Sequence, residues 1–326
     1  MIYHIIAFFL GFCLDLILGD PYYLPHTIRL IGNFISRLET VFLGNSKVRN
    51  EKKEKKQGVF LVVIVIVTVL LITSFILLGA YKLHVCLGII VETIMSYQIL
   101  ATKCLKVESM KVYKYLKDRD IEGARQSVSM IVGRDTNVLD EEGIAKAAIE
   151  TVAENTSDGV IAPMLYTALG GPILGFTYKA INTMDSMVGY KNEKYMFYGW
   201  CAAKLDDFVN FIPARISALF MIFAAFSSGK NFSGKRAWLM FKRDRYNHSS
   251  PNSAQTESAC AGALGIRLAG DAIYFGKIVK KPYIGDAVRK VEIEDIKKVN
   301  HLMYVTAWLS EIVMILLLVG CYIIVN

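Results

Sequence analysis

The chain has 326 residues, of which 54% are hydrophobic, and a mean hydropathy of +0.39. This composition is too apolar for an ordinary soluble enzyme of this length and predicts a membrane protein. The formal net charge is +8, but the lysines and arginines concentrate in the connections between apolar segments, which argues against nucleic acid as the partner.

Several segments are apolar enough to cross a bilayer as helices. The segment 58–79 has no charged residue, and the segment 303–325 has only Glu311. The segment 2–19 lacks the basic start and the small-residue cleavage site of a signal peptide, so we expect a retained anchor. The segment 83–102 is a weaker candidate because a carboxylate lies within it.

Two further segments, 160–181 and 208–228, are apolar but interrupted by glycine and proline. Each is either a span or a re-entrant segment, which membrane proteins tolerate where the backbone lines a protein cavity. Basic residues concentrate in 20–57, 103–157 and 229–302. The positive-inside rule therefore places these three connections in the cytoplasm and both termini outside.

The predicted fold class is all-α. Residues 103–157 show apolar positions at helical spacing, and no strand pattern of any length appears in the chain. We expect a polytopic integral membrane protein with roughly four to six membrane-associated helical segments and additional cytoplasmic helices. No internal repeat is present, and residues 1–326 are predicted to form a single membrane-embedded domain.

The first polar cluster is the stretch DLILGDPYYLPHTIRLIGNFI at 15–35. Asp15 is the only carboxylate of its apolar segment, and an intramembrane carboxylate is costly enough to be a functional candidate. His26 and Arg29 follow Asp20 in a turn punctuated by prolines, and we favour a functional role for the cluster. The alternative is structural, with Asp20 capping the next element and Arg29 extending to the membrane surface.

The second cluster is EEGIAKAAIETVAENTSDGVIAP at 141–163. Glu150, Glu154 and Asp158 are four residues apart, so a helix would place them on one face. Like charges at this spacing destabilise a bare helix, which indicates that a cation or a substrate group offsets them. Pairing of Lys146 with Glu150 is the structural alternative, but it leaves the other two carboxylates unexplained.

The third cluster is AINTMDSMVGYKNEKYMFYGWCAAKLDDFVNFIPAR at 180–215. Its oxygen ligands recur at helical spacings of three or four residues: Asn182, Asp185, Asp206, Asp207 and Asn210. Such oxygens suit magnesium, which takes one or two carboxylates together with water and phosphate. Positive charge for phosphate or carboxylate comes from Lys179, Lys191 and Arg215. The structural alternative is a solvated loop with helix caps.

The fourth cluster is HSSPNSAQTESACAGALGIRLAGDAIYFG at 248–276. The small residues from Ser258 to Gly265 allow close backbone approach, either to a neighbouring helix or to a phosphate. No standard nucleotide-binding loop is present. The candidate residues are His248, Asn252, Glu257 and Arg267.

These motifs resemble those of the adenosylcobinamide-phosphate synthases, a family of cobalamin-biosynthesis enzymes. The resemblance covers nearly the whole chain and rests on five stretches: DLILGDPYYLPHTIRLIG at 15–32, IVGRDT at 131–136, ETVAENTSDGVIAPMLY at 150–166, YKAINTMDSMVGYKNEKYMFYGWCAAKLDDFVNFIPAR at 178–215 and SPNSAQTESACAGALGIRLAG at 250–270. The chain departs from the family pattern at Thr27 and near Ser249, where the family usually has proline. It also departs at Gln255-Thr256, where the family has a Trp-Pro pair; the acidic motifs are unaffected.

The resemblance implies an ATP-dependent amide ligation. Adenosylcobyric acid, a corrinoid, presents a carboxylate, and (R)-1-amino-2-propanol O-phosphate or a related amino alcohol supplies the amine. The product is adenosylcobinamide phosphate. Magnesium-ATP would phosphorylate the carboxylate before the amine displaces phosphate. The expected partners are these substrates, the lipid bilayer and other membrane enzymes of nucleotide-loop assembly.

Residue chemistry then suggests a role for each candidate. The expected catalytic residues are Glu154, Asp158, Asp185 and Lys179. The expected metal ligands are Asp185, Asp206, Asp207 and Asn210. The residues expected to bind substrate or phosphate are His26, Arg29, Asn155, Asn182, Lys191, Arg215, Asn252 and Arg267.

Two other functional classes remain open from the sequence. The intramembrane carboxylates could form the ion path of a transporter, and a membrane sensor or accessory protein would need no catalytic activity. For the ligase, cytoplasmic ATP requires an active site facing the cytoplasm. We therefore expect a multi-pass protein of a prokaryotic inner or plasma membrane in which neither 160–181 nor 208–228 crosses fully.

Overall fold

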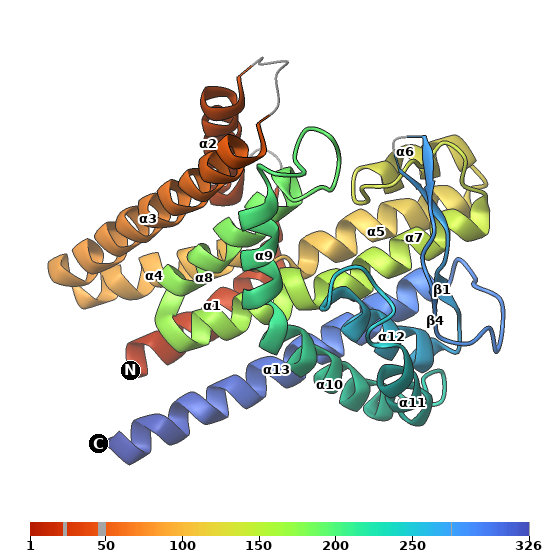
Figure 1. The fold of residues 1–326 in the computed structure, drawn as a ribbon. Coiled ribbons are helices and arrows are strands. Elements are labelled where there is room, and N and C mark those ends of the chain that lie inside the picture. Colours follow the sequence, from red (N-terminus) through yellow and green to blue (C-terminus); the bar gives the residue numbers. More distant parts are fainter. Residues whose placement is uncertain (22–24, 45–49, 275, 326) are drawn as a thin grey trace. The chain divides into compact units, whose positions relative to one another are not determined.

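The computed structural model describes residues 1–21, 25–44, 50–274 and 276–325. Helices dominate this part of the chain (Figure 1). It divides into two compact units, each built from segments that are far apart in the sequence. The first unit contains 1–101, 162–210 and 313–326, and the second contains 102–161 and 211–312. The single domain expected from the sequence stays a prediction.

The first unit is a helical bundle. Its helices are α1 (Ile2–Leu18), α2 (Thr27–Leu43), α3 (Glu51–Leu83), α4 (Val85–Ile99), α8 (Ala162–Val188) and α9 (Trp200–Val209). Its core is apolar and includes the fully buried side chains of Leu61, Ile99, Phe176 and Met184. The helix α3 begins at a cap, because the Asn50 side chain accepts the amide of Lys53 over 3.0 Å.

The second unit contains the helices α5 (Thr102–Lys117), α6 (Ile121–Ser129), α7 (Glu141–Asn155), α10 (Phe211–Ser227), α11 (Gly234–Asp244) and α12 (Ser253–Leu264), the π-helix η1 (Thr156–Ile161), and the start of α13 (Asp295–Val325). Every residue of α12 is buried. A Cβ atom at Gly262 would lie 2.4 Å from the carbonyl oxygen of Arg236 on α11. Sequence alone left open whether the small residues 258–265 approach a helix or a phosphate. At Gly262 they serve close packing against the helix α11.

Four short strands complete the described part of the second unit. They are β1 (Leu268–Ala269), β2 (Ala272–Tyr274), β3 (Lys277–Val279) and β4 (Tyr283–Ile284), paired antiparallel as β1 with β4 and β2 with β3. The sequence shows no pattern for these strands. Strands of two or three residues are too short to show the alternation by which a sequence reveals a strand. Glycines at positive φ, Gly270 and Gly285, flank the β1–β4 pair.

The predicted all-α membrane fold is confirmed. Among the described residues, four helices or continuous helical runs are long and apolar enough to cross a membrane: Glu51–Leu83, Val85–Lys117, Glu141–Val188 and Asp295–Val325. The helices α9 and α10 pass the same test only as a pair bent by 46°. α1 is apolar but shorter, with 17 residues.

The two segments expected to be interrupted are interrupted. Segment 160–181 lies largely in α8, whose backbone leaves the helical conformation at Gly170 and Gly171. Segment 208–228 begins at the bend between α9 and α10.

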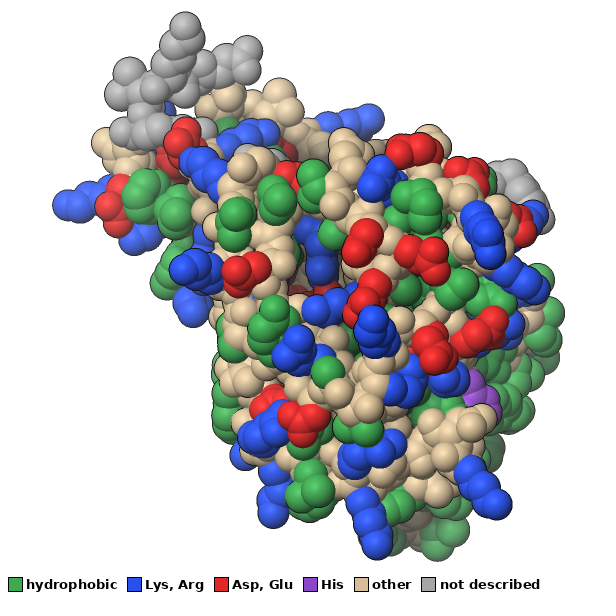
Figure 2. Space-filling view, turned by 90° about the vertical axis from the view of Figure 1, so that its right-hand side faces the viewer, with side chains coloured by type: hydrophobic (Ala, Val, Ile, Leu, Met, Phe, Trp, Pro, Cys, Tyr) green, Lys and Arg blue, Asp and Glu red, His purple; other side chains and the backbone are tan. Residues whose placement is uncertain are grey.

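Figure 2 shows one charged face of the molecule, where Lys and Arg are interspersed with Asp and Glu.

Candidate functional site

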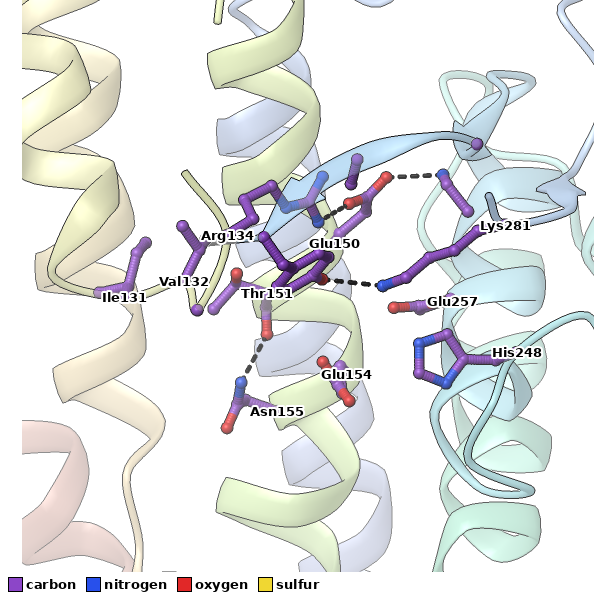
Figure 3. A pocket seen from close by; sticks show the side chains of 15 residues that line it. Ile131, Val132, Arg134, Glu150, Thr151, Glu154, Asn155, His248, Glu257 and Lys281 are labelled. Carbon is purple, nitrogen blue, oxygen red and sulfur yellow. Dashed lines mark hydrogen bonds and ion pairs between the residues drawn. The ribbon is translucent and has the colours of Figure 1, made fainter. Parts of the chain in front are cut away.

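A cavity of about 120 Å³ lies in the second unit, between α7 and α12 (Figure 3). The segment 131–134, which follows α6, and the region of the short strands also line the cavity. The lining side chains are unusually rich in ionisable groups for so small a space: Arg134, Glu150, Glu154, His248, Glu257 and Lys281. Perturbed ionisable groups converging on a cavity are typical of functional sites.

The helix α7 places two carboxylates at this cavity. Its first turn is capped by Asp140, whose carboxylate accepts the amide of Gly143 over 2.8 Å. Glu150 and Glu154 are one helical turn apart and both line the cavity, as their spacing predicts.

The third carboxylate of that predicted face is not at the cavity. The α-helix ends at Asn155, and Asp158 lies in the π-helix η1. Asp158 is not among the residues that line the cavity, so only Glu150 and Glu154 of the three carboxylates are placed there. π-Helical turns are frequent at functional sites, but they cannot be read from residue spacing.

Glu150 is held by groups of the protein. Its carboxylate forms an ion pair with Arg134 and accepts the backbone amide of Ala269 over 2.6 Å. Lys146 donates to the carbonyl oxygen of Ala269. The structural alternative, an ion pair of Lys146 with Glu150, does not form, because Arg134, from the loop before α7, pairs with Glu150 instead.

The helix α12 contributes Glu257, whose side chain points into the cavity (Figure 3). The residue is 5% exposed, and its Oε2 atom has no hydrogen-bond partner among the residues that the structure describes. Burial, followed by the nearby carboxylates of Glu154 and Glu150, raises the pKa of Glu257 well above its usual value. This carboxyl group therefore takes up a proton far more readily than an exposed glutamate.

His248 stands beside Glu257 at the cavity (Figure 3). Its Nδ1 atom accepts the backbone amide of Ser250 over 3.1 Å, which leaves Nε2 to carry the proton of a neutral ring. Burial lowers the pKa of His248. A neutral histidine beside a protonatable carboxyl group is suited to proton transfer.

Lys281 supplies the cavity's second cation. Its Nζ atom donates to the Tyr274 hydroxyl over 2.8 Å, which leaves further ammonium hydrogens to reach a ligand. Lys281 and Tyr274 were not among the candidates from the sequence, and Arg134 appeared there only within the motif IVGRDT. Tyr274 ends the short strand β2, and Lys281 lies in the connection between β3 and β4; strands this short leave no pattern in the sequence.

The remaining candidates of the second unit divide between the cavity and its surroundings. Asn155 lines the cavity and donates to the carbonyl oxygen of Thr151 over 2.9 Å. Arg215 donates to the side chain of Asn252 over 3.3 Å, away from the cavity. Arg267 lies 4.3 Å from the ring centroid of Tyr283. Asn252, Arg215 and Arg267 are not among the residues that line the cavity.

In the first unit, the magnesium candidates form pairs. Asn182 donates to the Asp206 carboxylate over 3.3 Å, and the Tyr178 hydroxyl donates to Asn210 over 2.8 Å. Asp207 lies 3.7 Å from Lys204. Neighbouring positions of a helix point in different directions, so α9 turns Asp206 inward while Asp207 faces its lysine.

Asp185 lies in the last turn of α8 and is half-buried. Within the described ranges, no group of three or more His, Cys, Asp or Glu side chains is arranged to hold a metal ion. The carboxylates of Asp185, Asp206 and Asp207 are therefore not gathered into a ready-made cage.

The remaining candidates of the first unit are its cations and His26. His26 caps α2 by accepting the amide of Ile28 over 3.3 Å, and its other ring nitrogen lies 3.0 Å from the Asp20 carboxylate. Arg29 donates to the carbonyl oxygen of Pro21 over 3.5 Å. Lys179 is half-buried on α8, and Lys191 is exposed after it.

Comparison with known proteins identifies the family. The family model described as CobD/Cbib protein matches residues 8–303. A protein named cobalamin biosynthesis protein CobD from Clostridium perfringens is 47% identical, over 96% of this chain and 97% of its own length. Proteins of the same name from Listeria monocytogenes and Citrobacter koseri are 46% and 42% identical, over 93% and 94% of this chain. No solved structure gives a significant match. With this coverage and identity, the chain belongs to the CobD/Cbib protein family.

Proposed function

We propose that this protein is a membrane-bound ligase of cobalamin biosynthesis. It joins a propionate carboxylate of adenosylcobyric acid to the amine of (R)-1-amino-2-propanol O-phosphate, or of a related amino alcohol, and consumes ATP. The product is adenosylcobinamide phosphate. Family membership supports the pathway, since the curated relatives are named as cobalamin biosynthesis proteins.

The observation that carries the proposal is the buried carboxyl group of Glu257 at the cavity. Amide formation requires a neutral amine, whereas a primary amine is protonated at neutral pH. The Glu257 carboxyl group, with Glu154 and His248 beside it, is suited to remove that proton. The cations Arg134 and Lys281 at the same cavity are suited to an anionic group of the same small substrate.

ATP and magnesium enter this proposal as co-substrate and metal ion. Magnesium needs only one or two protein carboxylates when phosphate and water complete its shell, so paired residues fit it even without a three-carboxylate cage. The Asp206–Asn182 pair fits this requirement, and Asp185, Asp207 and Asn210 stay proposed ligands with it. When bound, the ion would neutralise charge on the phosphates of ATP.

The proposed location is the bacterial cell membrane, with the ligation chemistry on the cytoplasmic side. The apolar helices support membrane insertion, and the curated relatives come from bacteria. The basic connections 103–157 and 229–302 supply most of the second unit, and the positive-inside rule places them in the cytoplasm. The phosphorylated amine would reach the cavity from that side, where ATP is also present.

The test is a component-omission assay with the purified full-length protein in detergent and lipid. Adenosylcobyric acid, aminopropanol phosphate and magnesium-ATP are supplied together, and each is then left out in turn. Mass spectrometry should detect the amide product only in the complete mixture. Absence of product with all components present would contradict the ligase. Uptake of substrate into vesicles without ATP chemistry would then support a transporter, and neither activity would support an accessory protein.

A further inference from the structure

We propose that the cavity between α7 and α12 is the binding site for the phosphorylated amino alcohol. Glu154 and Glu257 receive its ammonium group, and Lys281 with Arg134 receives its phosphate group. This inference rests on the proposed function and assigns one of the three substrates to a place in the chain.

The size of the cavity suits a small ligand. Its volume is about 120 Å³, whereas clefts that enclose drug-sized ligands measure roughly 300–1,000 Å³. The cavity therefore has room for a short amino alcohol phosphate.

The charges of the cavity suit a ligand that carries both signs. Glu150 is already paired with Arg134 and with the Ala269 amide, so it offers little to a ligand. Glu154 and Glu257 provide negative charge for an ammonium group. Lys281, and the guanidinium hydrogens of Arg134 that Glu150 does not use, provide donors for a phosphate.

Glu257 is the strongest sign that a ligand completes this site. Its Oε2 atom is buried and has no hydrogen-bond partner within the described part of the chain, although the residue lines the cavity. A buried polar atom without a partner costs free energy, so a donor that arrives with a ligand is expected to be favourable. An ammonium group provides three N–H donors, and its positive charge also reduces the repulsion between Glu257 and Glu154.

The same contact prepares the amine for reaction. One ammonium proton passes to the Glu257 carboxylate, which becomes a carboxylic acid and leaves a lone pair on the amine nitrogen. That nitrogen attacks the acyl phosphate formed from the corrinoid carboxylate and ATP, so a C–N bond forms and the C–O bond to phosphate breaks. The second nitrogen proton leaves with the phosphate as hydrogen phosphate.

The charge state of Glu257 is coupled to this binding. The groups that face it come from α7, from the loop before α7, from the connection between β3 and β4 and from the loop before α12: Glu150, Glu154, Arg134, Lys281 and His248. Burial and the two glutamates favour the protonated carboxyl group. An entering ammonium group favours the carboxylate, so binding is expected to release a proton.

The test measures binding of three compounds by calorimetry to the full-length protein in detergent. They are aminopropanol phosphate, aminopropanol without the phosphate, and isopropyl phosphate without the amine. Each is tested with and without a non-hydrolysable ATP analogue and magnesium. We expect wild type to bind the first at least tenfold more tightly than either fragment. Two buffers of different ionisation enthalpy should reveal the released proton.

Two substitutions separate the two ends of the ligand. Glu257→Gln should reduce the preference for aminopropanol phosphate over isopropyl phosphate about tenfold and abolish proton release. Lys281→Gln should instead reduce the preference over free aminopropanol. Glu142→Gln, an exposed carboxylate in the first turn of α7, should change neither preference. If Glu257→Gln does not fold, Glu154→Gln replaces it, because Glu154 is partly exposed. This variant should also show a reduced preference for aminopropanol phosphate over isopropyl phosphate.

Failure of the subsite and failure of the ligase give different results. Amide product from wild type, with both preferences unchanged in the Glu257 and Lys281 variants, would overturn the subsite and leave the ligase intact. Absence of product with the expected binding pattern would contradict the ligase alone. Wild type that binds none of the three compounds under either condition would overturn the subsite.

Discussion

Glu150 and Ala269 are 119 positions apart in the chain, yet the carboxylate of one accepts the backbone amide of the other over 2.6 Å. Lys146, one turn earlier on α7, donates to the carbonyl oxygen of the same alanine. Ala269 has a φ of 57°, which is uncommon for a residue other than glycine. The helix α7 thus binds both the amide and the carbonyl group of Ala269, whose backbone is left-handed, and so fixes one wall of the cavity.

Glu150→Gln should therefore lower the stability of the fold. The substitution leaves Arg134 without its ion pair partner in a largely buried position, and breaking a buried pair costs about 3 kcal/mol or more. Chemical denaturation in detergent measures the change in unfolding free energy. Glu141→Gln, exposed in the first turn of the same helix, should have little effect. Equal stability of both variants would show that Glu150 does not anchor this wall.

Gly262→Ala should loosen the contact between α11 and α12. The new methyl group would overlap the backbone at Arg236, and forcing extra volume into a packed interior costs about 1–3 kcal/mol. The matched control is Gly79→Ala on α3, where nothing lies within 4 Å of the added atom. That control should be neutral or stabilising, since alanine favours helix. Thermal unfolding of the two variants side by side measures the difference, and similar melting would contradict the packing role.

Glu257→Gln should change stability in a pH-dependent way. The pKa of Glu257 is higher in the fold than its unfolded value near 4.5, so its contribution to stability is fully present below that value. The contribution is lost as the pH rises through the folded pKa, where the fold must bury an ionised carboxylate. The neutral glutamine avoids this loss. The variant should be more stable than wild type at about pH 8, and its advantage should shrink towards about pH 5. A constant difference across this range would contradict a raised pKa.

Asp206→Asn should abolish turnover and leave the protein folded. The substitution keeps the side-chain volume and the helix α9 but removes the negative charge proposed to hold magnesium. Product formation is measured by mass spectrometry over a range of magnesium concentrations, with the exposed substitution Glu193→Gln as control. Near-normal turnover of Asp206→Asn would remove Asp206 from the metal site.

Lys194→Cys reports the side of the membrane that the stretch 180–215 faces. The Nζ atom of Lys194 lies 2.6 Å from the Glu39 carboxylate. Because 54% of the Lys194 side chain is exposed, a cysteine at this position is accessible to a reagent. In a variant without the six native cysteines, we expect an impermeant maleimide to label it only after the cytoplasmic side is opened. Labelling from the outside alone would contradict the cytoplasmic arrangement.

Elements governed by local chemistry were predictable from the sequence. The uncharged segment 58–79 had to lie in a long apolar helix, and α3 contains it. The four-residue spacing correctly placed Glu150 and Glu154 on one side of α7, and the fourth cluster already contained His248 and Glu257. These inferences needed only helical periodicity and the cost of unpaired charge.

The remaining features depend on contacts between distant segments. Asp158 lies in a π-helix and does not line the cavity, and nothing in its residue spacing reveals this. Arg134 replaces Lys146 as the partner of Glu150 because the loop before α7 folds back. Lys281 reaches the cavity through strands of two or three residues, which are too short to leave a pattern.

One isotope experiment tests the ligase most directly. Adenosylcobyric acid carrying ¹⁸O in its free propionate carboxylate is incubated with the protein, aminopropanol phosphate and magnesium-ATP. Activation of the carboxylate by ATP predicts the amide product together with one ¹⁸O atom in the inorganic phosphate released for each amide formed. Amide formed without transfer of ¹⁸O to phosphate, or no amide at all in the complete mixture, would contradict it.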